Sequence, residues 1–305
     1  MLINHIAAHV LARRRSYRFH SWLLCIARTA RVLLYPHAHR QLCSLPLFAG
    51  YVAQPGNDDL FHHLSHRHYL ARHLNLDQRV RAVLTHYRTE DALFDTAYRE
   101  AVYRGAGLTL WEERANGSAA RLRLAMATRN NAEGDLTLAL DIDSQRLHRI
   151  SFSWVDGALG GSAERVLPYI ARNQGHGPEE EVAFARFNQA FPNNSPSYFC
   201  LAAMHGIAEA LGVAELLAVA SAWQVAARPE KGKRFANAYD GLWAAAGGMP
   251  SADGTAWRLP VPAPARPLHE LPAKHRKRTA MRRAHWAAIS AACRDTLRAH
   301  RRGKW

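Results

Sequence analysis

The chain has 305 residues, of which 48% are hydrophobic and 21% charged, as in soluble globular proteins that bury a sizeable core. Its four cysteines are widely spaced and form no C-x-x-C pair, which argues against structural zinc and a disulfide framework: Cys25, Cys43, Cys200 and Cys293. Most of the formal charge of +15 lies at the two ends, because residues 1–40 contain seven Arg and no acid, and residues 265–305 contain twelve Lys or Arg and two acids. Basic ends suit an acidic partner, although charge runs also form ordinary solvated faces.

Residues 1–105 are predicted to be helical. The segment 22–35 has the pattern of an amphipathic helix, which fits either a core-facing helix or one that lies on a membrane surface. Basic residues and histidines interrupt every apolar stretch near the N-terminus, so no window reaches the ~18 apolar residues of a membrane span. The charge order also differs from that of a secretory signal, so neither a span nor a signal peptide is expected.

Residues 54–59, QPGNDD, predict a turn and the start of a helix, and apolar residues then recur at helical spacing through residue 97. His62 and His66 have the i, i+4 spacing of two zinc ligands on one helix. Since no Glu accompanies them and Arg67 and Arg72 lie close by, surface or packing histidines are the favoured interpretation. No metal site is predicted.

Residues 106–171 have the short alternating or apolar runs of antiparallel strands, separated by turns at NGS and NNAEGD. A further strand is expected at 163–170. Two helices should follow at 178–191 and 195–212, with Gly212 as a C-cap, then a buried strand at 214–225 and a short helix at 236–248. His205 lies on the apolar second helix, where a core histidine is favoured over a catalytic base.

Several motifs together resemble the bacterial VirK/YbjX family over roughly residues 45–300, in this order: HRHYLARHLNLDQRVRAVLTHY, EGDLTLAL, RISFSWV, NQG, AYDGLWAAAGG, DGTAWRLP and KHRKRTAMRR. The family is associated with virulence, surface display of a virulence protein and resistance to antimicrobial peptides, and carries no agreed reaction. The resemblance implies a bacterial envelope context and an association with membranes. The cysteine usage and the absence of a signal or span pattern favour the cytoplasm, so a cytoplasmic protein peripheral to the inner membrane is expected. Relatives tend to carry an acidic residue where this chain has Ala244, Ala245 and Ala246.

The segment RNQGHGPEE, residues 172–180, raises a question of chemistry. Arg172-x-x-Gly175-x-Gly177 is similar to the [Q/R]-x-x-G-x-[G/A] loop that binds the acyl-CoA pyrophosphate in GNAT acyltransferases. Glycines let backbone N–H groups approach an anion, and a following helix N-terminus adds positive potential. Three consecutive glutamates, residues 179–181, would oppose a pyrophosphate there. A plain structural turn is the alternative.

The element order is similar to the GNAT fold as well. Residues 237–248 resemble the Asn-x-x-Ala…Tyr tail of that fold, where the tyrosine protonates the leaving thiolate; the matching positions are Asn237 and Tyr239. The resemblance therefore implies Tyr239 as a general acid and Arg172, Gln174, Gly175, Gly177 and Asn237 as donor-binding residues. No bound cofactor is expected, and acyl-CoA or acyl-carrier protein would be the co-substrate.

A proline-rich linker at 260–267 leads to a basic C-terminal helix at 268–305. Six basic residues of this helix are the candidate contacts for an anionic membrane surface or an acidic carrier protein: Lys274, Arg276, Lys277, Arg278, Arg282 and Arg283. Nucleic acid is a weaker alternative, because no recognised DNA- or RNA-binding pattern accompanies the charge.

The sequence thus predicts an α+β protein with a helical N-terminal region (1–105), a mostly antiparallel, GNAT-like core (106–260), and a linker with a basic helix (261–305). The leading functional hypothesis is acyl transfer from a thioester to an amine or hydroxyl. The alternative is a non-enzymatic, membrane-peripheral accessory protein that aids surface localisation or antimicrobial-peptide resistance.

Overall fold

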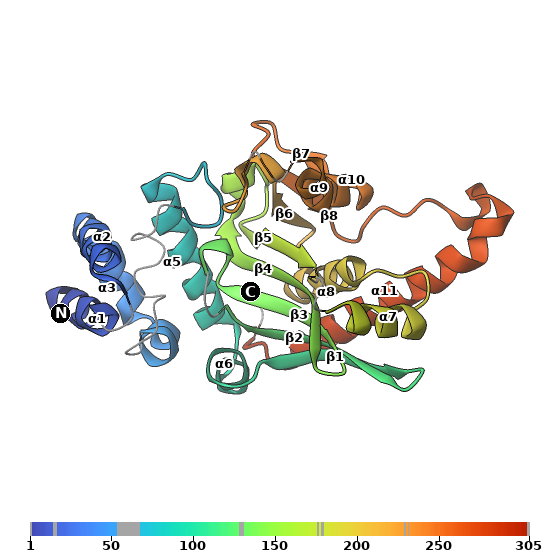
Figure 1. Ribbon diagram of the computed structural model, residues 1–305, viewed down its shortest axis with the longest axis horizontal. Helices are drawn as coiled ribbons and strands as arrows, with labels where there is room; N and C mark the ends of the chain where they lie inside the picture. The colour runs from blue at the N-terminus through green and yellow to red at the C-terminus, as the bar shows by residue number, and fades with distance from the viewer. Residues whose placement is uncertain are drawn as a thin grey trace.

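The computed structural model describes residues 2–14, 17–53, 68–127, 131–175, 177, 180–228, 230 and 232–303. The N-terminal part is helical, with α1 (Leu2–Arg14), α2 (Phe19–Thr29), a 3₁₀ turn (Ala30–Leu34), α3 (Pro36–Ser44) and a π turn (Phe48–Val52). In Figure 1 the first helices lie at one end of the long axis, beyond α5. His62 and His66 lie outside the described residues.

Helix α5 (Leu76–Leu93) connects this part to the sheet. It begins at a capping box, in which the Asn75 side chain accepts from the Gln78 N–H at 2.9 Å and the Gln78 side chain accepts from the Asn75 N–H at 3.0 Å. A short helix, α6 (Thr96–Arg99), and a π turn (Glu100–Arg104) lead into the first strand.

The centre of the molecule is a sheet with the order β1-β2-β3-β4-β5-β6-β8-β7. Its strands are β1 (Leu108–Ala115), β2 (Ser118–Met126), β3 (Leu136–Ile142), β4 (Gln145–Asp156), β5 (Val166–Gly175), β6 (Glu215–Val219), β7 (Met249–Pro250) and β8 (Ala256–Pro260). Neighbours are antiparallel except β5 and β6, which run parallel. The β1–β2 hairpin turns at Asn116 and Gly117, both with positive φ, as a type I′ turn requires.

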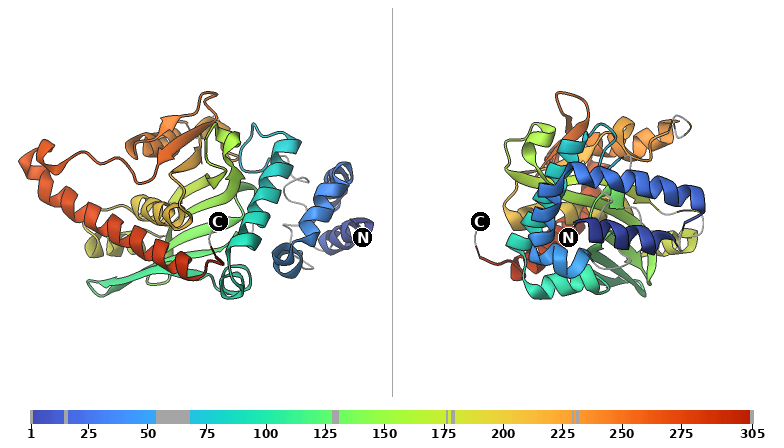
Figure 2. Two further views of the ribbon diagram at one scale, coloured as in Figure 1. Left: turned by 180° about the vertical axis from the view of Figure 1, so that it is seen from behind. Right: turned by 90° about the vertical axis from the view of Figure 1, so that its left-hand side faces the viewer.

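One face of the sheet is covered by helices that lie behind it in Figure 1 and in front of it in the left view of Figure 2. Helix α8 (Pro196–Leu211) packs on β3, β4 and β5, and α11 (Ala273–Ala299) packs on α8 and β1. Helices α8 and α11 approach closely at Gly206, where an added Cβ would lie 2.2 Å from the Ser290 carbonyl oxygen. Gly212 ends α8 in the left-handed conformation, as predicted.

The chain beyond α11 returns to the N-terminal half of the molecule. The Arg302 N–H donates to the Leu93 carbonyl at 2.7 Å, and the Asp95 N–H donates to the His300 carbonyl at 3.0 Å. The C-terminal part of α11 is therefore a structural element of the core, with Ile289, Cys293 and Leu297 fully buried. Its N-terminal part extends away from the body in Figures 1 and 2.

The α+β class, the mostly antiparallel central sheet and the basic C-terminal helix are confirmed. Several strand and helix boundaries differ from the predicted ones. The fifth strand continues through Gly175, five residues beyond the predicted end, because residues 172–175 pair with 148–151 of β4. The predicted strand at 214–225 ends at Val219, and a 3₁₀ turn (Ser221–Trp223) follows it. The helix predicted at 178–191 is α7, Glu181–Ala190.

Candidate functional site

A cavity opens where β5 and β6 separate. The two strands pair only at Tyr169–Leu217 and Ile170–Ala218, and beyond this point β5 stays with β4 through Gly175 while β6 ends at Val219. A cavity of about 690 Å³ lies there, lined by Ala132, Glu133, Arg172, Asn173, Gln174, Gly175, Val225, Ala226, Arg228, Arg234, Phe235, Ala238 and Tyr239. We call it the β5/β6 pocket.

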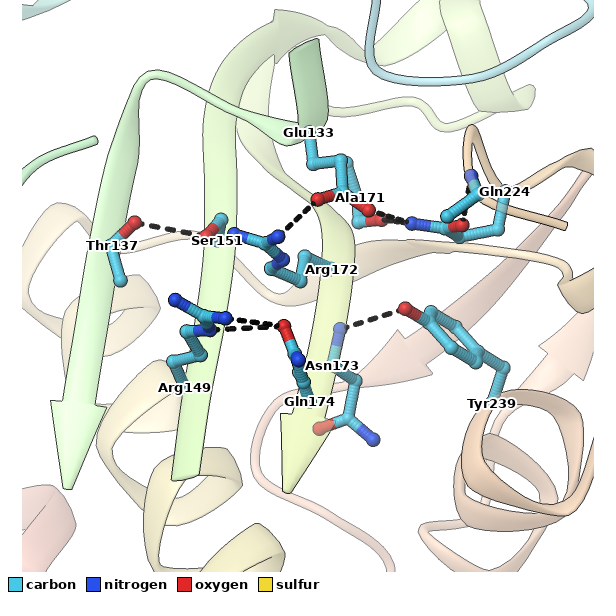
Figure 3. A network of polar contacts seen from close by, with 11 residues as sticks. Glu133, Thr137, Arg149, Ser151, Ala171, Arg172, Asn173, Gln174, Gln224 and Tyr239 are labelled. Atoms are coloured by element: carbon cyan, nitrogen blue, oxygen red, sulfur yellow. Dashed lines mark hydrogen bonds and ion pairs between the residues drawn. The ribbon is translucent and has the colours of Figure 1, made fainter. Parts of the chain in front are cut away.

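Tyr239 lines this pocket from a π turn (Asn237–Gly241) that follows α9 (Gly232–Ala236) and precedes α10 (Leu242–Ala245). Its hydroxyl accepts a hydrogen bond from the Asn173 backbone N–H at 3.2 Å (Figure 3). The Asn173 side chain ties the same turn to β5, because its Nδ2 donates to the Ala238 carbonyl at 2.6 Å. Burial raises the pKa of Tyr239 well above its usual range, so the phenol keeps its proton at neutral pH.

A buried carboxylate faces the same pocket. Glu133 ends a 3₁₀ turn (Asn131–Glu133) between β2 and β3, and its Oε2 lies 2.6 Å from Arg172 Nη2 (Figure 3). Its Oε1 accepts from Gln224 Nε2, which also donates to the Ala171 carbonyl at 3.2 Å. Sequence reasoning missed Glu133, because NNAEGD has the composition of an ordinary turn.

Four of the predicted site residues meet at this pocket and two do not. Arg172, Gln174, Gly175 and Tyr239 line it, whereas Gly177 and Asn237 do not belong to its described lining. Gln174 accepts two hydrogen bonds from the Arg149 guanidinium on β4, at 3.0 and 2.7 Å.

The glycine turn already binds a carboxylate of its own chain. The Gly177 N–H donates to Glu180 Oε2 at 2.7 Å. Gly175 belongs to β5 and not to the turn. Gly177, the glycine of the turn itself, therefore directs its N–H toward an internal anion.

The three alanines at which the family resemblance implies an acidic residue, Ala244, Ala245 and Ala246, lie outside the described lining of the pocket, and Ala246 is buried. Ala244 and Ala245 are exposed on α10. The preceding Asp240 is structural, because it accepts from the Ser221 N–H and from Trp257 Nε1, each at 2.9 Å.

The other predicted groups fall outside the pocket. His205 is buried in α8, where desolvation lowers its pKa to about 4, so it is neutral at physiological pH. Within the described ranges, no three His, Cys, Asp or Glu side chains cluster as metal ligands would. No helix in the described part of the chain is long and apolar enough to cross a bilayer.

The six basic residues predicted on the C-terminal helix differ in exposure. Lys274, Arg276, Lys277 and Arg278 are exposed. Arg276 also joins the helix to the segment before it, because its Nε donates to the Leu271 carbonyl and its Nη2 to the His269 carbonyl, both at 2.9 Å. Arg282 lies over the Trp286 ring at 5.6 Å. Arg282 and Arg283 are half-buried.

These features define an α+β protein with a pocket, lined by both charged and apolar side chains, between two diverging parallel strands. The sequence profile of a family described as "Protein of unknown function (DUF535)", the bacterial VirK/YbjX family, matches residues 10–290, and the chain belongs to this family. No curated protein and no solved structure matches the chain.

Proposed function

We propose that the β5/β6 pocket is the active site of an acyltransferase that takes its acyl group from a thioester. The observation that carries the proposal is the pocket itself, which opens at the only parallel strand pair among the described strands and holds a protonated tyrosine and a carboxylate. The order β4, β5, helix, β6 is similar to the order that the GNAT resemblance implies, but two helices, α7 and α8, separate β5 from β6 where that fold has one.

The residues of the pocket suit direct transfer. The amine or hydroxyl of the acceptor attacks the thioester carbonyl carbon, forming the new C–N or C–O bond, and the C–S bond breaks. Glu133 takes the proton that the nucleophile loses, and Tyr239 gives its phenolic proton to the departing thiolate. The proton on Glu133 then returns to Tyr239 through solvent, which restores both groups.

Two exposed arginines provide a place for donor phosphates. Arg228 and Arg234, which follow β6 in the chain, are exposed and belong to the lining of the pocket. Guanidinium groups bind phosphate bidentately, and this role does not need the glycine turn that Glu180 occupies.

Calorimetry with acyl-CoA and with acyl-carrier protein tests the proposal. We expect the wild-type protein to bind one of these donors, and Arg228→Gln with Arg234→Gln to weaken CoA binding at least about tenfold. Arg40→Gln is the matched control, because Arg40 is an exposed arginine on α3. Folded wild-type protein that binds neither donor would contradict the acyltransferase proposal.

A second observation favours peripheral membrane attachment. Of the twelve large apolar side chains that are exposed in the described part of the chain, seven lie within the first 34 residues: Ile3, Leu11, Phe19, Leu23, Leu24, Leu33 and Leu34. Arg14, Arg18 and Arg31 are exposed among them. Apolar side chains interspersed with arginine suit the surface of an anionic bilayer. Sedimentation with anionic and with neutral liposomes tests this role, which predicts retention by the anionic liposomes alone.

A further inference from the structure

The face of the sheet opposite α8 carries a second hollow, of about 200 Å³, over β2, β3, β4 and β5. Its floor consists of small side chains, because Ala125 and Ala139 occupy neighbouring strands and Thr137 lies beside Ala125 in the register. Four arginines surround it: Arg123, Arg146, Arg149 and Arg172. We call it the arginine hollow.

The alignment of strands brings these arginines together. Ala139 on β3 lies between two of them in the register. It is the cross-strand partner of Arg123 on β2 and of Arg149 on β4. Arg172 on β5 is the cross-strand partner of Ser151, the residue two positions along β4 from Arg149. Alternate residues of a strand share one face, so the guanidinium groups rise from the same side of the sheet.

Carboxylates balance only part of this charge. Asp141 pairs with Arg123 at 3.0 Å and with Arg146 at 2.7 Å, and Glu133 pairs with Arg172 at 2.6 Å. Arg149 donates only to the neutral Gln174 amide and has no ion pair among the described residues. Burial and the nearby Arg172 and Arg146 lower the pKa of Arg149, although Glu133 and Glu180 partly offset them.

We propose that the arginine hollow binds a phosphate group, with Arg149 as its principal contact. A guanidinium fork matches phosphate oxygens, and an added anion relieves the repulsion among the four arginines. The hollow also shares Arg172 with the β5/β6 pocket. We infer that the phosphate belongs to the acceptor, whose amine or hydroxyl then reaches Glu133. This inference rests on the acyltransferase proposal.

Inorganic phosphate is the probe for this site. We expect wild-type protein to bind it in calorimetry, with an affinity that falls as salt rises, and Arg149→Gln to lower that affinity at least about tenfold. Arg121→Gln is the matched control, because Arg121 lies on β2 outside the hollow and pairs with Glu112 at 3.0 Å. Circular dichroism establishes that both variants are folded. No phosphate binding by the wild type, or equal losses in both variants, would overturn the proposal.

Competition separates this site from the donor site. We expect acyl-CoA to leave unchanged the part of the phosphate binding that Arg149→Gln removes. Displacement of this part by acyl-CoA would overturn the assignment to an acceptor. If the protein binds no acyl donor but keeps an Arg149-dependent phosphate site, the acyltransferase proposal fails and the phosphate site stands.

The source of the phosphate is distinguished by two further competitors. Phosphoethanolamine, which carries an amine, represents a soluble phosphate ester, and short-chain phosphatidic acid represents a lipid head group. Displacement of inorganic phosphate by either one supports the proposal and identifies the source. Failure of both to displace it would show that the hollow accepts only the free ion, against a substrate role.

Discussion

Tyr239 offers the most direct test of chemistry at a single residue. If it is the general acid, Tyr239→Phe should lower turnover roughly 10²–10⁴-fold and leave donor affinity unchanged, because only a proton transfer in the transition state is lost. The lost acceptor for the Asn173 N–H should also cost about 1 kcal/mol of stability. Tyr198→Phe, on the far-side helix α8, is the control. Equal turnover in wild type and Tyr239→Phe would remove Tyr239 from the mechanism.

Glu90 is a buried carboxyl group away from the pocket. It accepts from Trp154 Nε1 at 2.6 Å, from the Tyr103 hydroxyl at 3.0 Å and from the Tyr98 hydroxyl at 3.3 Å. Burial raises the pKa of Glu90 to about 7, and the three hydrogen bonds act in the opposite direction. The folded protein therefore holds this proton more tightly than the unfolded chain does.

The elevated pKa of Glu90 predicts a dependence of stability on pH. The contribution of the Glu90 proton to the stability of the folded state is complete below the unfolded pKa near 4.5 and is lost as pH rises through about 7. The total change in the free energy of unfolding is on the order of 3 kcal/mol. Urea unfolding between pH 4 and pH 8 measures it. Glu90→Gln, which cannot ionise, should lack this component, and an identical pH profile for the two proteins would contradict the assignment.

At the scale of elements, Gly206 sets the distance between α8 and α11. Gly206→Ala would bring its Cβ against the Ser290 carbonyl and the Cys293 Cβ, so we expect a loss of about 1–3 kcal/mol in the free energy of unfolding. Gly241→Ala is the matched control, because its Cβ would meet Asn237 only at an ordinary 3.7 Å. Denaturant titration of both variants measures the difference, and equal stabilities would show that the two helices separate without cost.

Helix α11 combines a buried half and a basic exposed half. Changing Lys274, Lys277 and Arg278 together to Gln should leave the melting temperature unchanged, because all three are exposed. If this segment contacts anionic lipid, liposome binding should weaken by roughly 1 kcal/mol per charge. Arg276 is left in place because its guanidinium donates hydrogen bonds to two backbone carbonyls. A lower melting temperature with unaltered liposome binding would make the segment structural only.

The sequence predicted elements better than it predicted their ends. Alternating or continuous apolar runs identified β1 to β4, and burial alternates along much of β2 but is nearly continuous along β3 and most of β4. It placed the end of β5 too early, because Asn173 and Gly175 are poor strand formers that pair with β4 through tertiary contacts. Glu133 was missed for a related reason, since no local pattern reveals that a turn residue will face Arg172 on a strand 39 positions later.

At the scale of the molecule, the exposed N-terminal helices and the exposed half of α11 lie at opposite ends of the long axis (Figure 1). Replacing Leu11, Phe19 and Leu34 with Ser should therefore abolish liposome binding at one end without affecting the core, because their side chains are 62%, 72% and 69% exposed. Sedimentation with anionic liposomes measures it, and Met249→Ser, 69% exposed on β7, is the control. Unchanged binding would exclude the N-terminal helices as the contact.

The return of residues 300–302 to Leu93 and Asp95 has a consequence for synthesis. A nascent chain cannot complete the α5 end of the molecule, or cover α8 and β1 with α11, until residue 302 has left the ribosome. Until then the apolar face of α8 is exposed to solvent and to other chains. Folding of this protein is therefore completed only after residue 302 emerges, and a ribosome stalled within α11 would present a surface on which chaperones act.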